Sequence, residues 1–272
     1  MTSFVAWIGV DSRGPASVYL ASDSRISWGQ NLVWDYARKL FASQRNPELL
    51  GYVGDVLFPS LVLGQLTSAI DLGSLLDGAA SPTEKWTRIQ SCIKQSFSAF
   101  PSSERRTFTV VYATRELEGM NSKFYVRTLS WGIEESWAEA AIPIPSASGL
   151  LHVLGSGAGS ILRWQQRWDS SSQGRTSRAV FSAFCDALQS GEDPLTGGAP
   201  QLVGLYRQGP GRALGVVYES KPFLFGLHAD PFRGSADLEW RDGLFERCDP
   251  TGQVLAEAQR HHAPHGLGKS QA

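Results

Sequence analysis

The chain has 272 residues, 42% of them hydrophobic and 19% charged, so its composition predicts one globular body with a sizeable core rather than disorder. A formal net charge of -1 at pH 7 leaves no excess of cations to neutralise phosphates, which argues against a nucleic-acid-binding protein. Three cysteines without ligand-like spacing indicate reduced thiols and a cytoplasmic location.

Two short β-prone runs open the chain, at residues 3–10 and 16–22, and the turn-rich cluster between them predicts a hairpin. The first run has no basic flank, so it does not resemble a signal peptide, and no later stretch reaches the ~20 apolar residues of a membrane span. Two helices are expected next. Apolar residues recur at helical spacing over 57–70, and Ser81 with Pro82 and Glu84 predicts a capped start for the second helix.

Strands are then expected at 107–114, 123–133 and 135–142, where the pattern is β-rich and partly alternating. A strand at 151–154 leads into the glycine-rich turn GSGAG at 155–159 and a helix, and a further helix is expected over 175–190. Strands at 201–206, 213–218 and 222–227 complete the body. This order favours an α+β fold with two sheets between two helix layers, a four-layer α-β-β-α sandwich.

We expect one main domain over residues 1–228 and a C-terminal extension over 229–272. The extension is rich in polar and turn residues, which favours weak order with at most one hairpin, around 244–255.

Four motifs near the N-terminus stand in a fixed order: MTSFV at 1–5, ASDSR at 21–25, ARKLF at 37–41 and LGYVGD at 50–55. With them, residues 2–228 resemble a proteasome β-type, HslV-like subunit of the N-terminal-nucleophile hydrolase superfamily, most closely the longer betaproteobacterial proteasome homologue. In that family a threonine starts the first strand, and a lysine follows an acidic residue by sixteen positions. Asp23 and Lys39 have this spacing.

The chemistry of Thr2 can be argued without the resemblance. If an aminopeptidase removes Met1, as is expected before so small a residue, Thr2 carries a hydroxyl and a free α-amine, which is a nucleophile with its own base. A nearby Lys39 ammonium would stabilise the developing alkoxide, and Asp23 would keep Lys39 charged and oriented. Arg25 would help to keep Asp23 ionised.

The resemblance implies further site residues. Gly51 matches the glycine whose backbone N–H serves as an oxyanion donor. Ser156, Asp193 and Thr196 match residues that surround the terminal amine and position water, although the family more often has serine where Thr196 stands. Positions that match the primary specificity pocket are apolar or small, which implies an apolar side chain before the cleaved bond; they are Ile26, Ala37, Leu49 and Val53.

The activity implied is that of a threonine-type endopeptidase whose active sites face the inner chamber of a homo-oligomer, a stacked hexameric or heptameric double ring. Its substrates would be peptides or unfolded proteins. No cofactor is required; a structural cation held by backbone carbonyls near Asp193 is compatible with the resemblance and leaves no residue signature. The sequence does not decide whether an ATP-dependent unfoldase docks on the rings.

Two alternatives remain open at this stage. One is an amidohydrolase of the same superfamily that acts on small amides as a monomer or dimer. The other is an inactive ring or scaffold subunit, against which the complete set of Thr2, Asp23, Lys39 and Gly51 argues. Each motif alone has an ordinary explanation, such as a surface ion pair for Asp23 or a solvated lysine for Lys39.

Overall fold

The computed structural model describes residues 2–28, 32–132, 134–229 and 238–258. In these ranges the chain forms four α-helices and strands that pair almost entirely antiparallel, so the fold class is α+β, as the sequence predicts. The helices are α1 (Leu57–Asp71), α2 (Pro82–Ala99), α3 (Ala158–Asp169) and α4 (Ser177–Ser190). None of them combines the length and the apolar character that crossing a membrane would require.

One sheet has nine strands among the described residues, and its main path runs in the order β10-β1-β2-β11-β12-β13-β14. Its strands are β1 (Phe4–Asp11), β2 (Gly14–Ser22), β10 (Gly149–Leu154), β11 (Gln201–Tyr206), β12 (Arg212–Tyr218), β13 (Lys221–Leu224), β14 (Leu227–His228), β15 (Trp240–Arg241) and β16 (Arg247–Cys248).

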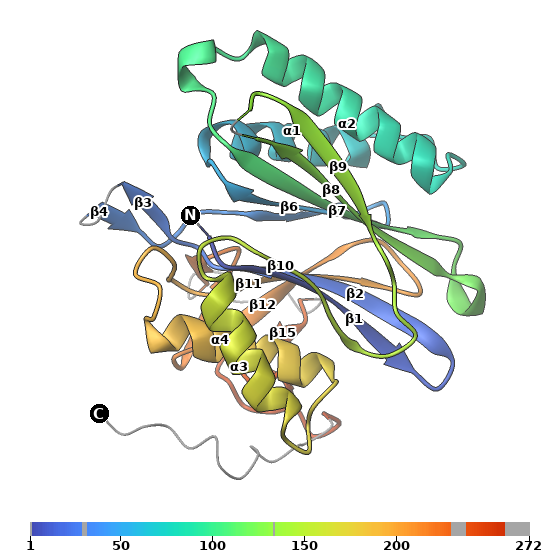
Figure 1. The fold of residues 1–272 in the computed structure, drawn as a ribbon. Coiled ribbons are helices and arrows are strands. Elements are labelled where there is room, and N and C mark those ends of the chain that lie inside the picture. Colours follow the sequence, from blue (N-terminus) through green and yellow to red (C-terminus); the bar gives the residue numbers. More distant parts are fainter. Residues whose placement is uncertain (1, 29–31, 133, 230–237, 259–272) are drawn as a thin grey trace.

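A second sheet has five strands in sequence order, and a separate hairpin has two. The five strands are β5 (Leu40–Ala42), β6 (Glu48–Gly54), β7 (Phe108–Glu116), β8 (Lys123–Trp131) and β9 (Trp137–Ile142). The hairpin joins β3 (Ile26–Trp28) to β4 (Leu32–Trp34) and projects from the body in Figure 1.

Strand β1 is buried on both of its faces over most of its length. In β1, Val5 and Trp7 pack in the cluster that contains α3 and α4, whereas Phe4, Ala6 and Ile8 pack in the cluster between the sheets. Helices α1 and α2 cover the other face of the five-stranded sheet, as Figure 1 shows. A strand that is buried on both sides needs a continuous apolar run, and FVAWI at 4–8 supplies one.

Helix ends follow their local sequence signals. Ser81 Oγ accepts a hydrogen bond from the backbone N–H of Glu84, and the Glu84 carboxylate accepts one from the Ser81 N–H, so the expected capping box is confirmed. Thr176 caps α4, which ends at Gly191 with a left-handed φ of 62°. Some strands were not predicted: neither β6 nor the β3–β4 hairpin is expected from the sequence.

The C-terminal extension differs from the expectation of weak order. Residues 238–258 pack against the main body, and β15 pairs with β12 in parallel. The Trp240 ring lies directly on Gly215, where a Cβ would come within 2.3 Å of it, and Arg178 of α4 forms a buried ion pair with Glu246. Apolar burial thus orders this part of a polar-looking segment. Strands β15 and β16 form a hairpin over 240–248, which only overlaps the expected 244–255; residues 230–237 and 259–272 lie outside the described residues.

Candidate active site

Thr2 lies two residues before Phe4, the first residue of β1 in the nine-stranded sheet. It is fully buried. Its neighbour Ser3 is bound to Asp23 in two ways: the Asp23 N–H donates to the Ser3 carbonyl (3.1 Å), and the Ser3 N–H donates to Asp23 Oδ1 (3.0 Å). Asp23 directly follows β2, the partner of β1. Strand pairing therefore fixes the Asp23 carboxylate beside the start of the chain.

Lys39 completes the centre from the other sheet. Its ammonium lies 2.7 Å from Asp23 Oδ1, and both side chains have 0% exposure. The same Nζ donates to the Arg25 carbonyl at 2.7 Å and to Thr2 Oγ1 at 3.4 Å. These contacts match the three donors of an ammonium group. The structure brings Thr2, Asp23 and Lys39 together as the spacing predicts.

Backbone donors also support the Asp23 carboxylate. Oδ2 accepts hydrogen bonds from the N–H groups of Arg25 (3.2 Å) and Gly197 (3.1 Å). A buried ion pair is tolerated only when its remaining hydrogen-bonding groups are satisfied, and here they are. Burial lowers the pKa of Lys39 below its ordinary value, and the Asp23 carboxylate opposes that shift.

This arrangement can activate a hydroxyl. Because the Lys39 ammonium donates to Thr2 Oγ1, the hydroxyl oxygen accepts there and its own proton points to another acceptor. The cation would also stabilise negative charge on Oγ1 as the proton leaves, and water cannot screen the interaction at a fully buried site.

The GSGAG turn approaches Thr2 through its glycines. A Cβ on Gly155, which has a φ of 93°, would lie 1.8 Å from the Thr2 carbonyl oxygen, and one on Gly157 would lie 1.9 Å from Ser3 Oγ. Only glycine allows this approach. The Gly157 N–H donates to the Thr2 carbonyl at 3.4 Å, and Ser156, between the two glycines, is exposed at the tip of the turn.

The 193–198 segment packs against this turn. Thr196 is buried, and its methyl group would be 3.5 Å from a Cβ on Gly157, so it lies beside the glycine turn. Its hydroxyl donates to the Asp193 carbonyl (3.3 Å). Asp193 Oδ1 accepts the Leu195 N–H, whereas Oδ2 is buried without a hydrogen-bond partner in the described structure. Asp193 Oδ2 can therefore accept a hydrogen bond from another group.

The Arg25 guanidinium interacts with Asp23 through its charge, but its hydrogen bonds go to other residues. It forms a bidentate pair with Asp35 at 2.7 and 2.9 Å and donates to the Pro194 carbonyl at 3.1 Å. This pair raises the pKa of Arg25. Asp23 instead receives its cation from Lys39, so Arg25 acts by tying the 193–198 segment to the Asp35 turn.

Gly51 lies in the middle of β6 and not at the site. The Tyr52 N–H donates to the Lys39 carbonyl on the β5 side (3.3 Å), and the Asp55 N–H donates to the Thr107 carbonyl on the β7 side (2.9 Å). Because N–H groups alternate between the two edges of a strand, the Gly51 N–H faces β7 and belongs to the ladder. The prediction of an oxyanion donor at Gly51 is therefore wrong.

By the same alternation the N–H of Gly54 faces the β5 side, beyond the last β5 pair, Leu40 with Gly51. Gly54 has a φ of 99°, and a Cβ there would lie 2.5 Å from the Thr107 carbonyl oxygen, so glycine is required. Gly54 is the second glycine of LGYVGD and the last residue of β6.

A pocket of about 760 Å³ opens beside Gly54. Apolar and charged side chains share its wall, among them Ile26, Trp28, Val56, Leu57, Asp55 and Arg106. Of the four predicted pocket residues only Ile26 lines it. Leu49 and Val53 are buried between the sheets, because alternation along β6 turns both side chains into the core. Ala37 lies outside the strands and is also buried.

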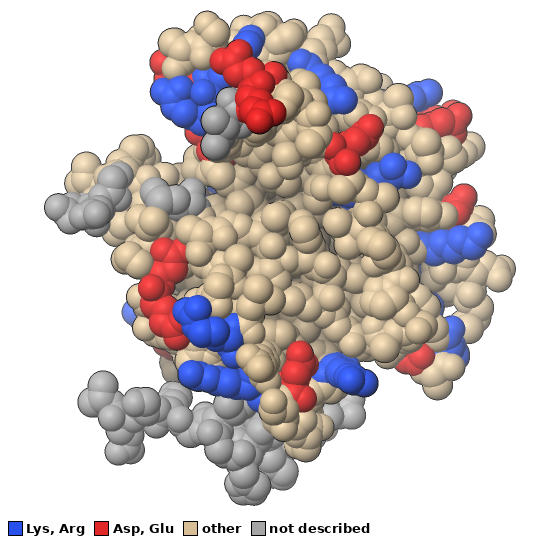
Figure 2. Space-filling model, viewed as in Figure 1, with Lys and Arg blue, Asp and Glu red and all other residues tan. Residues whose placement is uncertain are grey.

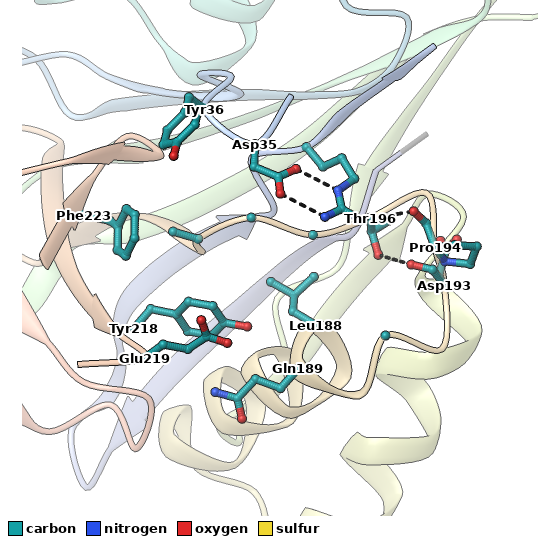
Figure 3. Close-up of a pocket in the computed structure, with 15 residues that line it drawn as sticks. Asp35, Tyr36, Leu188, Gln189, Asp193, Pro194, Thr196, Tyr218, Glu219 and Phe223 are labelled. Atoms are coloured by element: carbon teal, nitrogen blue, oxygen red, sulfur yellow. Dashed lines mark hydrogen bonds and ion pairs between the residues drawn. The ribbon is translucent and has the colours of Figure 1, made fainter. Parts of the chain in front are cut away.

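Figure 3 shows a second pocket, of about 450 Å³, whose wall includes Asp35, Tyr36, Asp193 and Thr196 together with Tyr218 and Phe223. Thr2, Asp23 and Lys39 do not line it. This pocket therefore borders the 193–198 segment and not Thr2.

Backbone carbonyls of the 193–197 segment, which the resemblance implies as ligands of a structural cation, are hydrogen-bonded within the protein. The carbonyls of Asp193, Pro194, Leu195 and Gly197 already accept hydrogen bonds from protein donors, and the Arg25 guanidinium occupies the adjacent space. The described residues also contain no cluster of three His, Cys, Asp or Glu side chains suited to a metal ion. We derive no catalytic step through a cation.

No protein-family model matches the chain, and a comparison with curated proteins gives no match either. The functional argument therefore depends on the site geometry and on the sequence motifs.

Removing the cation of the buried Asp23–Lys39 pair should destabilise the fold much more than removing the cation of an exposed pair. Lys39→Met should lower the free energy of unfolding by about 3 to 5 kcal/mol, because it leaves the Asp23 charge buried without its cation. Arg13→Met, at a pair with an exposed arginine, should change it by less than about 1 kcal/mol. Urea denaturation at neutral pH measures both, and equal effects would contradict the burial argument.

Proposed function

We propose that this protein is a threonine-type peptidase of the N-terminal-nucleophile class, with Thr2 as nucleophile. The observation that carries the proposal is the contact of 3.4 Å between Lys39 Nζ and Thr2 Oγ1, made by a lysine that is held in a fully buried pair with Asp23. The contact places a cation beside a hydroxyl oxygen, where it would stabilise the alkoxide that forms when the hydroxyl attacks.

In the proposed reaction Thr2 Oγ1 attacks the carbonyl carbon of a peptide bond. The hydroxyl proton passes to the α-amine and then to the leaving amine, so the first product departs and an ester remains on Thr2. The backbone N–H of Gly54 would hold the oxyanion, in place of the Gly51 N–H that the sequence predicts. Water then hydrolyses the ester with the α-amine as base, and the hydroxyl is restored.

The proposal requires Thr2 to be the first residue of the mature protein, because only then is its amine a base. Ser156, Asp193 and Thr196 support it, since the GSGAG turn and the 193–198 segment converge on Thr2 and Ser3. The buried Asp193 Oδ2 is an acceptor suited to hold an ammonium or a water near such an amine.

The arrangement of the layers supports the same class. Helices α1 and α2, the five-stranded sheet, the nine-stranded sheet and helices α3 and α4 follow one another in Figure 1, in the order of an α-β-β-α sandwich. In this proposal the main domain covers residues 1–228, and the reaction takes place in a reducing, cytoplasmic compartment, which the three free cysteines fit.

A peptide or unfolded protein is the proposed substrate. The pocket beside Gly54 offers Ile26, Trp28, Val56 and Leu57 to an apolar side chain before the cleaved bond. No cofactor enters the proposed steps.

We also propose that the chain assembles with copies of itself, as a stacked ring that encloses its sites. The β3–β4 hairpin exposes a cluster of large apolar side chains, Trp28, Leu32, Val33, Trp34 and Tyr36. Figure 2 shows a broad face whose centre lacks charged side chains, and residues 140–162, which include the edge strand β10, contain no Asp, Glu, Lys or Arg. Uncharged edges and apolar patches of this kind are usually covered in native assemblies.

Replacement of the nucleophile tests the activity. Thr2→Val keeps the shape of the side chain and should lower kcat on a fluorogenic peptide with an apolar residue before the amide by at least about 1,000-fold, because the attacking oxygen is lost. Thr2→Ser keeps the hydroxyl and should retain measurable turnover. Hydrolysis by Thr2→Val at the wild-type rate would contradict the proposal.

Sedimentation tests the assembly. The wild-type protein should sediment as a large oligomer, and Trp34→Glu should shift it to smaller species because a charge would be buried at the contact. Leu72→Glu, at a residue with 79% exposure outside the hairpin, is the matched control and should leave the oligomer intact. A wild-type monomer, or equal behaviour of both variants, would rule this interface out.

A further inference from the structure

Gln201 is a buried polar residue that the proposed reaction steps do not use. It is the first residue of β11, pairs with Ser22 of β2, and has 1% exposure. A buried amide must satisfy its donors and its acceptor inside the protein. The partners of Gln201 are all backbone groups of the segments that carry the Asp23–Lys39 pair.

Each hydrogen-bonding group of the Gln201 amide has a partner. Nε2 donates to the carbonyls of Asp23 (3.0 Å) and Ala37 (2.8 Å), and Oε1 accepts the N–H of Lys39 (3.0 Å). The partners determine the orientation of the amide, because a flipped amide would place its NH₂ group against an N–H and its oxygen against two carbonyls.

These contacts join the two sheets at the site. Asp23 continues β2 of the nine-stranded sheet, whereas Ala37 and Lys39 lead into β5 of the five-stranded sheet. The Lys39 main chain is held by Gln201 at its N–H and by the Tyr52 N–H at its carbonyl (3.3 Å). Gln201 therefore sets the position of the Lys39 main chain relative to Asp23.

The position of Lys39 sets the lengths of two contacts made by its ammonium group. Its ammonium is 2.7 Å from Asp23 Oδ1 and 3.4 Å from Thr2 Oγ1. A movement of the Lys39 main chain away from the nine-stranded sheet would lengthen both distances, and catalysis is sensitive to displacements of about 1 Å.

We propose that Gln201 is a positioning residue that holds the Lys39 segment of one sheet against the Asp23 segment of the other and so fixes the Lys39 ammonium at Thr2. This inference rests on the proposed function for its catalytic consequence, but the positioning itself can be measured without any reaction. The Gln201 amide hydrogen-bonds to Asp23, Ala37 and Lys39 and does not line the pocket beside Gly54, so it acts through Lys39.

The test compares three variants. Gln201→Met keeps the length of the side chain and removes the amide, and Gln201→Glu keeps an acceptor for the Lys39 N–H while it removes the NH₂ donor. Gln165→Met is the matched control, because Gln165 is also a buried glutamine, bonded through Nε2 to Asp169 within α3. Two quantities are measured for each: kcat and KM on the fluorogenic peptide, and the rate at which formaldehyde and borohydride methylate Lys39, read by peptide mass spectrometry.

In Gln201→Met we expect kcat to fall at least about 10-fold while KM changes less than about 3-fold, because positioning affects the chemical step more than binding. Lys39, protected in the wild type by full burial, should be methylated at least about 10-fold faster. Gln165→Met should match the wild type in both quantities.

Gln201→Glu separates positioning from simple loss of stability. Its carboxyl group regains a donor when it is protonated, so the ratio of its kcat to the wild-type kcat should rise as the pH falls. Because protonation of a buried carboxyl group also raises the stability of the fold, the folded fraction is measured by circular dichroism at each pH and kcat is expressed per folded protein.

A methylation rate of Lys39 in Gln201→Met equal to that of the wild type would overturn the proposal. So would faster methylation with an unchanged kcat. A wild-type protein that hydrolyses no peptide would contradict the proposed peptidase function instead, and the methylation rates would then support or overturn the positioning by themselves.

Discussion

The site depends on one interaction, the ion pair between Asp23 and Lys39, which is closed off from solvent where the two sheets meet. Two charges are costly to bury, and the surroundings offset that cost with backbone N–H groups on Asp23 and a carbonyl on Lys39. The pair then presents an ammonium to the hydroxyl of Thr2. Loss of either charge would leave the other buried, which ties the stability of this end of the fold to the integrity of the site.

The two-sheet architecture places each partner. Strands β1 and β2 pair so that Ser3, the neighbour of Thr2, lies opposite Asp23, and β5 enters the other sheet directly after Lys39. Gly155 and Gly157 let the GSGAG turn contact the Thr2 carbonyl and the Ser3 side chain, which no larger residue would permit. The burial of β1 on both faces makes its continuous apolar run necessary. The strand that forms part of the core thus also positions Thr2.

Much of this could be predicted from the sequence. The order of strands and helices follows from apolar periodicity and caps, and the sixteen-residue spacing of Asp23 and Lys39 identifies a pair that the structure brings into contact. The direction in which a backbone N–H or a side chain points was harder to predict than the position of its residue in a strand. Which edge of β6 the Gly51 N–H faces depends on strand register, and Leu49 turns into the core by the same rule, so motif matching misplaced both. Gln201 and Asp35 carry no local signal at all, because their partners are 162 and 10 residues away in the chain. The extension was misjudged because Trp240 is buried among residues of polar composition.

The most direct test of the account is the intact mass of the purified protein before and after treatment with a peptide epoxyketone, which reacts with the hydroxyl and the free amine of the same N-terminal threonine. The account predicts a mass that lacks Met1 and a gain of one inhibitor per chain, absent in Thr2→Ala. A mass that retains Met1, with no adduct, would contradict the claim that the Asp23–Lys39 pair serves an N-terminal nucleophile.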